Sequence, residues 1–111
     1  MSLLNWLAGV FSSRGKALSM CKRGMRRARK HDRAGAIGDY SAVIGMPGVP
    51  ADVRAMALYN RALVHSAAGD DIQATGDLDS ILAMTETLIN VKTSARQKLA
   101  RMSHQRAERR V

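Results

Sequence analysis

The chain has 111 residues, of which 46% are hydrophobic and only 4% aromatic, and its formal net charge is +9. This length favours one small domain, and a core built mainly from Ala, Leu, Met and Val favours helices over strands. The single cysteine, Cys21, excludes a disulfide within the chain, and no stretch has the roughly 18 to 20 apolar residues that a membrane-spanning helix needs. We therefore expect a cytoplasmic protein that is at most peripheral to a membrane.

The charges are distributed unevenly along the sequence. Residues 14–33 carry nine Lys or Arg and one acid, residues 34–91 carry two basic and seven acidic residues, and residues 92–111 carry seven basic residues and one acid. Both ends are thus basic and the middle is acidic. This asymmetry favours an anionic partner, or a homo-oligomer in which basic helices of one copy meet the acidic middle of another.

The first segment, residues 1–13, has the spacing of an amphipathic helix, with apolar residues at i, i+3, i+4 and i+7. These residues are Leu3, Leu4, Trp6, Leu7, Val10 and Phe11. Two interpretations stay open. The segment is a remnant of an earlier repeat that caps the first hairpin, or it is an anchor for an anionic membrane surface or a partner's groove, followed by Arg14 and Lys16.

The pattern of residues 14–31 predicts a basic helix with a stripe of small and apolar residues on one side. The stripe consists of Ala17, Met20, Gly24 and Ala28. Arg27 takes a position that is usually apolar in such a helix, so we expect its stem to pack and its guanidinium to reach water. The remaining cations form a candidate basic patch that covers more than one face: Lys22, Arg26, Arg29, Lys30 and Arg33.

Capping signals divide the rest of the chain into further helices. Asp32 predicts the N-cap of a second helix that runs to about Gly45, and residues 46–50 predict a turn. Pro50 stands at the start of a third helix over residues 51–68, because a helix tolerates proline in its first turn.

The C-terminal half continues in the same way. Gly69 ends the third helix, and one of the two aspartates after it begins a fourth helix that runs to about Met84. Residues 90–106 predict the final helix, and residues 107–111 a polar tail. The stripes that we expect to be buried are Ala55, Leu58, Ala62 and His65 on the third helix, and Val91, Ala95, Leu99 and Met102 on the final one.

The pattern of these helices recurs with a shift of 38 residues. GDYSAVI at 38–44 lies over GDLDSIL at 76–82. Further matches at this shift are Arg23 with Arg61, Asp32 with Asp70, Ala36 with Ala74, and, in a third partial copy, Val53 with Val91 and Ala57 with Ala95. One hairpin cannot bury its apolar stripe alone, so the recurrence predicts helical hairpins stacked on one another.

These copies resemble the tetratricopeptide repeat family. The motifs that carry the resemblance are Asn60-Arg61-Ala62 and Lys22-Arg23-Gly24 for its first helix, and Ala36 with Asp39-Tyr40 and Ala74 with Asp77-Leu78 for its second. The usual period is about 34 residues, so we expect the extra residues in the turn around 46–52. The resemblance covers residues 16–102. It implies an all-α fold, a short solenoid of antiparallel helix hairpins over residues 14–106, with an N-terminal amphipathic helix and a C-terminal capping helix.

The resemblance also implies a function in protein binding, because the first helices of such hairpins line a concave groove. The residues it places there are Leu18, Cys21, Met25, Ala28, Arg29, Met56, Tyr59, Leu63, Ser66, Ala67, Gln97 and Arg101. This groove is mostly apolar with two arginines at its rim. We expect it to bind a helix or an extended apolar segment that carries an acidic residue.

Catalytic and metal-binding patterns are missing from the sequence. His31, His65 and His104 are far apart, and Cys21 has no motif around it. We therefore expect no enzyme activity and no cofactor. The alternative to a protein-binding adaptor is electrostatic binding to nucleic acid or to an anionic membrane, through residues 22–33 and the basic C-terminus. The near absence of aromatic residues for base stacking favours the adaptor.

Overall fold

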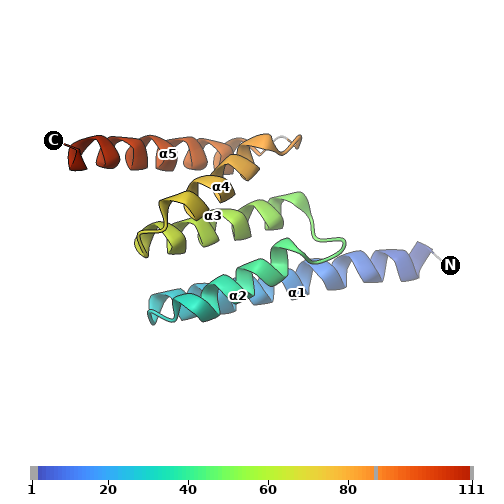
Figure 1. The fold of residues 1–111 in the computed structure, drawn as a ribbon. Helices are drawn as coiled ribbons and strands as arrows, with labels where there is room; N and C mark the ends of the chain where they lie inside the picture. The colour runs from blue at the N-terminus through green and yellow to red at the C-terminus, as the bar shows by residue number, and fades with distance from the viewer. Residues whose placement is uncertain (1–2, 87, 111) are drawn as a thin grey trace.

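The computed structural model of this chain describes residues 3–86 and 88–110, with the backbone alone for residues 5–12. Over these residues it is all-helical, with five helices: α1 (Leu3–Arg29), α2 (Arg33–Ile44), α3 (Ala51–Ala67), α4 (Asp71–Ala83) and α5 (Ile89–Arg109) (Figure 1). The helices pack as hairpins, α1 with α2 and α3 with α4, and α5 packs against α4 and α3. The chain is therefore a short solenoid of helical hairpins, which confirms the predicted fold class.

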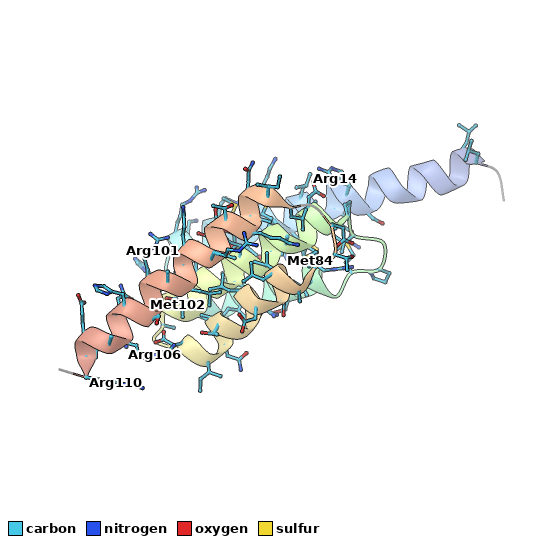
Figure 2. The ribbon with its side chains drawn as sticks, turned by 90° about the horizontal axis from the view of Figure 1, so that it is seen from above. Arg14, Met84, Arg101, Met102, Arg106 and Arg110 are labelled. Atoms are coloured by element: carbon cyan, nitrogen blue, oxygen red, sulfur yellow. The ribbon has the colours of Figure 1, made fainter. Side chains whose placement is uncertain are left out.

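The helices form two layers. α3 contacts both α1 and α5, and these three make one layer, whereas α2 and α4 lie on the other side (Figures 1 and 2). The N-terminal ends of α1, α3 and α5 all point to the same end of the molecule (Figure 1). We call the outward surface of α1, α3 and α5 the A face.

The first helix, α1, is continuous, whereas the sequence predicts two separate helices in this part of the chain. α1 has 27 residues and runs through residue 13 without a break. The predicted boundary between an N-terminal helix over 1–13 and the repeat domain is therefore wrong. The reason is that the helical spacing of the apolar side continues across it, from Val10 to Ala17 and Cys21, and outweighs the weak helix propensity of Gly9 and Gly15.

The first turns of α1 extend beyond the ends of the other helices (Figures 1 and 2). Leu3 and Leu4 are 71% and 76% exposed, so they do not cap the first hairpin. The side chains of Trp6, Leu7, Val10 and Phe11 lie outside the described part of the structure. At the other end of the chain, α5 reaches Arg109, so most of the predicted polar tail is helical.

The turns within the two hairpins are built alike. Asp32 caps α2 by accepting a hydrogen bond from the Gly35 N–H at 3.0 Å, and Asp70 caps α4 by accepting one from the Gln73 N–H at 3.3 Å. The residue before each cap has a positive φ, 63° at His31 and 81° at Gly69. The predicted caps are thus confirmed, and the two hairpin turns repeat at the predicted shift of 38 residues.

The core consists of two clusters that meet at α3. The first lies between α1, α2 and α3 and comprises Ala17, Cys21, Ala36, Tyr40, Val43, Val49, Val53, Ala57 and Val64. The second lies between α3, α4 and α5 and comprises Leu58, Ala62, Ala74, Leu78, Ile81, Ala95 and Met102. In the first hairpin, a small residue on α1 faces a large one on α2. A Cβ at Gly24 would lie only 2.8 Å from the Tyr40 ring, so this contact requires glycine.

Candidate interaction surface

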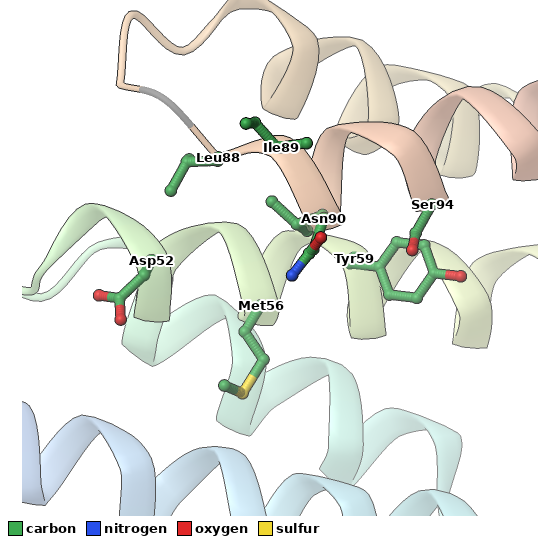
Figure 3. Close-up of a pocket in the computed structure, with 8 residues that line it drawn as sticks. Asp52, Met56, Tyr59, Leu88, Ile89, Asn90 and Ser94 are labelled. Atoms are coloured by element: carbon green, nitrogen blue, oxygen red, sulfur yellow. The ribbon is translucent and has the colours of Figure 1, made fainter.

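The main hollow on the A face lies between the N-terminal turns of α3 and α5 (Figure 3). Its volume is about 480 Å³, and it is open to solvent. The residues that line it are Asp52, Met56, Tyr59, Leu88, Ile89, Asn90, Val91 and Ser94. We call it the α3–α5 groove. Met56 is 39% exposed and Ile89 is 69% exposed, so apolar side chains on both walls are accessible.

Two polar contacts shape this groove. Asp52, in the first turn of α3, pairs with Arg14 of α1 at 3.0 Å. The hydrogen bond from Arg14 holds the pKa of the Asp52 carboxyl below its usual range. Lys92 donates through its Nζ to the Met84 carbonyl oxygen at 2.6 Å and so ties the start of α5 to the end of α4. The one carboxylate in the groove lining is therefore neutralised by a cation of the same chain.

A smaller hollow lies where the α1–α2 turn meets the C-terminal half of α3. Its volume is about 280 Å³, and its lining is Ala28, His31, Arg33, Leu63, Val64 and Ala67. Leu63 is 37% exposed there. The predicted continuous groove is thus two separate hollows on the same face.

The repeat register shows how charge is distributed over the A face. Equivalent positions of α1, α3 and α5 form rows across this face, because the helices repeat every 38 residues and lie side by side. The rows are Leu18, Met56 and Ser94; Lys22, Asn60 and Lys98; and Met25, Leu63 and Arg101. Two of the three rows therefore have an apolar residue of α3 in the middle, and the cations of the three rows are Lys22 on α1 and Lys98 and Arg101 on α5.

The structure assigns the predicted groove residues to different places. Met56 and Tyr59 line the α3–α5 groove, and Ala28, Leu63 and Ala67 line the smaller hollow. Cys21 was predicted to face the groove, and this is wrong: it is 1% exposed because its side of α1 packs in the first core cluster. Other predicted members lie outside both linings: Leu18, Met25, Arg29, Ser66, Gln97 and Arg101.

The sequence reasoning missed the wall that α5 contributes. Leu88, Ile89, Asn90, Val91 and Ser94 line the groove, but the turn before α5 gave no clear boundary in the sequence. A signal existed, since Asn90 and Ser94 occupy the positions equivalent to Asp52 and Met56 at the 38-residue shift.

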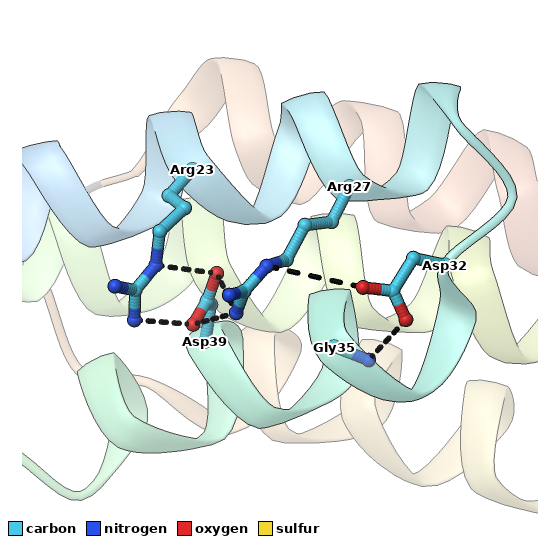
Figure 4. A network of polar contacts seen from close by, with 5 residues as sticks. All are labelled: Arg23, Arg27, Asp32, Gly35 and Asp39. Carbon is cyan, nitrogen blue, oxygen red and sulfur yellow. Dashed lines mark hydrogen bonds and ion pairs between the residues drawn. The ribbon is translucent and has the colours of Figure 1, made fainter.

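Each hairpin contains a buried aspartate that binds arginine. Asp39 accepts hydrogen bonds from Arg23, with the shortest at 2.8 Å, and from Arg27 at 3.0 Å (Figure 4). Arg23 holds the pKa of Asp39 below its usual value, although burial opposes this. Asp77 likewise accepts from Arg61 at 2.7 and 2.8 Å. With both carboxylates occupied by bidentate partners inside a hairpin, we assign them a structural role.

The environment of Arg27 differs from the predicted one, because its guanidinium forms ion pairs and is not surrounded by water alone. It binds Asp39 and lies 3.9 Å from Asp32 (Figure 4). Arg61 also donates to the Ser41 Oγ of α2 at 3.0 Å, which links the two hairpins. The acidic middle of the sequence is thus largely paired with arginines of the same chain, since Asp71 also lies 3.8 Å from Arg109.

The predicted basic patch is exposed on α1 and the start of α2. Lys22, Arg26, Arg29, Lys30 and Arg33 are all solvent-accessible. Arg26 also lines a shallow hollow on the outer side of α1, with Lys16, Ser19, Met20 and Arg23. At the 38-residue shift, Ser19 and Arg26 correspond to Ala57 and Val64, which α3 buries in the first core cluster. The outer side of α1 is therefore a polar end of the stack.

Among the residues that the structure describes, there is no group of three or more His, Cys, Asp or Glu placed to hold a metal ion. Within the described ranges, none of the helices combines the length and the apolar character required to cross a bilayer. Comparison of the chain with protein-family models, with curated proteins and with solved structures gives no match.

Proposed function

We propose that this protein is a non-enzymatic adaptor of the tetratricopeptide repeat kind that binds a segment of a partner protein on its A face. The α3–α5 groove is the observation that carries this proposal. Two different repeats build its walls, and its accessible residues Met56 and Ile89 are apolar. A solvent-exposed apolar groove of this kind fits the apolar side of a helix or an extended segment.

The charges around the groove favour a partner with acidic flanks. Asp52 is already paired with Arg14, so it offers little attraction to a cationic ligand. Lys22 and Arg101 are exposed on the neighbouring helices of the A face. Apolar contacts would supply the affinity, and these cations would orient an acidic segment. Such an adaptor would act in the cytoplasm.

A photo-cross-linking residue at Met56 tests this proposal. We expect the cross-link to a partner to persist in about 0.5 M NaCl, because screening weakens charge contacts but not apolar ones. Tyr59→Ala or Ile89→Glu should abolish it, because both residues line the groove. The matched control is the same cross-linker at Asp79, which is exposed on α4 in the other layer. Equal capture from Asp79, or none from Met56, would contradict groove binding.

Electrostatic binding to nucleic acid or an anionic membrane is the second candidate. The observation in its favour is the exposed cluster of Lys22, Arg26, Arg29, Lys30 and Arg33. Binding of a short DNA or of anionic vesicles through this cluster should fall steeply with salt. It should also be lost when Arg26, Arg29 and Lys30 are all replaced by Glu, while Tyr59→Ala leaves it unchanged. Salt-resistant binding would exclude this mechanism.

A further inference from the structure

The first turns of α1 form the largest feature that the groove proposal leaves without a role. They extend beyond the other helices, at the end of the molecule where α3 and α5 begin (Figures 1 and 2). Residues 3–13 carry no charged side chain. Their apolar residues recur at helical spacing and continue the side of α1 that is buried further along, at Ala17 and Cys21. We call residues 3–13 the α1 extension.

The α1 extension cannot reach the groove of its own chain. It belongs to the same unbroken helix as Ala17 and Cys21, which are buried in the first hairpin. The helix therefore directs the extension away from the body, and Leu3 and Leu4 stay exposed. The extension and the groove are nevertheless complementary, since one is an uncharged apolar helix and the other an apolar hollow.

We propose that the α1 extension of a second copy of this chain occupies the α3–α5 groove, in a two-fold symmetric dimer in which each copy inserts its extension into the other. This rests on the proposed function, because it places a second copy in the same groove; the uncharged extension uses the apolar walls of that groove and not the cations beside it. Two antiparallel extensions can lie side by side, with each tip at the groove of the other copy. Eleven helical residues span about 16 Å. When the two extensions overlap along this whole length, each tip lies level with the base of the other, where Arg14 binds Asp52 in the groove lining.

Symmetry and chemistry both favour this occupant. A two-fold arrangement forms the extension–groove contact twice, so it buries both extensions and both grooves without leaving a free copy of either. The extension brings no charge into the groove, and Asp52 keeps Arg14 as its cation, so no charge is buried without a partner. An anionic membrane is the competing occupant, because Lys22 and Arg29 share the helical side of Leu4 and Phe11, and the tests below distinguish it from the dimer.

Sedimentation equilibrium of the full chain is the first test. We expect a species of twice the 12.1 kDa chain mass that persists in about 0.5 M NaCl. Leu4→Glu and Met56→Glu should each restore the monomer, and Asp79→Ala should not. These three side chains are exposed, so circular dichroism should show unchanged helicity in all variants.

Disulfide trapping between different chains is the second test. Leu4→Cys on one chain and Ile89→Cys on another should give a cross-linked heterodimer under mild oxidation, whereas Leu4→Cys with Asp79→Cys should not. The native Cys21 is buried and should not react.

Three results would overturn the proposal. They are a monomer at all concentrations, a cross-link only between two Leu4→Cys chains, and a monomer that floats with phosphatidylserine vesicles and loses this binding on Leu4→Glu. Failure of the dimer alone leaves the adaptor function standing, provided that Met56 still cross-links a different protein. Loss of that cross-link as well would contradict both the dimer and the adaptor function.

Discussion

The two hairpins have different residues at positions that are equivalent under the 38-residue shift. In the first hairpin Gly24 faces Tyr40, and at the equivalent positions of the second hairpin Ala62 and Leu78 are both buried in the second core cluster. The small position is larger in the second hairpin and the large position is smaller, so the two changes in size offset each other.

The buried aspartates differ in the same compensating way. Asp39 binds two arginines of α1, whereas Asp77 binds Arg61, which also reaches Ser41 of the preceding hairpin. Both arginines that bind Asp39 thus belong to the first hairpin, whereas the arginine that binds Asp77 also donates a hydrogen bond to the first hairpin. Arg61 therefore stabilises the contact between the two hairpins as well as its own hairpin.

The largest expected effect is therefore the loss of Arg61. Arg61→Ala should lower the free energy of unfolding by about 2 to 3 kcal/mol, because it leaves the buried Asp77 without a cation and removes the link to Ser41. Arg23→Ala should cost less, since Arg27 still binds Asp39. Urea unfolding of both variants checks the order, and equal losses would mean that the second arginine of the first hairpin contributes nothing.

The next effect concerns Gly24 and Tyr40. Gly24→Ala should destabilise the chain by about 2 kcal/mol, because the new methyl group would press on the Tyr40 ring. In a Tyr40→Leu background, which copies the second hairpin, the same substitution should become neutral or stabilising by up to about 1 kcal/mol through helix propensity. A double-mutant cycle measures this coupling, and additive effects would show that the contact is not tight.

A smaller effect is expected at the turns. His31 holds a positive φ where the second hairpin has Gly69. His31→Gly should stabilise the chain by about 1 kcal/mol, and Gly69→Ala should destabilise it by a similar amount, because a left-handed conformation strains a residue with a Cβ. Thermal or urea unfolding gives both values. A destabilising His31→Gly would mean that the imidazole makes a contact worth more than the strain.

The smallest effect concerns acid stability. The pKa of Asp39 lies below its unfolded value, so the aspartate stabilises the fold above the unfolded pKa, and this contribution is lost as the pH falls through the folded pKa. Wild-type stability should therefore drop below about pH 4. Asp39→Asn should be less stable at pH 7 but lose less on acidification. Parallel pH curves for the two proteins would exclude a role of Asp39 in acid unfolding.

Much of the fold follows from local signals in the sequence. Asp32, Asp70 and Gly69 mark helix ends, and the 38-residue shift predicts which helices pack as hairpins. Pairing across a hairpin was harder to predict. Arg23 and Arg61 match at this shift, as do Asp39 and Asp77, but the sequence alone does not show that each arginine turns toward the aspartate 16 residues later.

The candidate site was predicted less completely than the fold. Helical position places Met56 and Tyr59 on the accessible side of α3, whereas the burial of Cys21 depends on how α2 and α3 pack against α1. The α5 wall depends on where the helix begins after the turn, which Ile89 and Val91 do not signal. The continuity of α1 was missed because residues 1–13 were interpreted as a separate amphipathic helix, either a remnant of an earlier repeat or an anchor.

The burial of Cys21 has a practical consequence. Its thiol is the only one in the chain, burial raises its pKa, and it lies in the first core cluster between α1, α2 and α3. An alkylating reagent can reach the sulfur only when these helices move apart. The rate of labelling under native conditions therefore reports local opening of the first core cluster and not of the second, which makes the protein its own probe of whether the two halves unfold together.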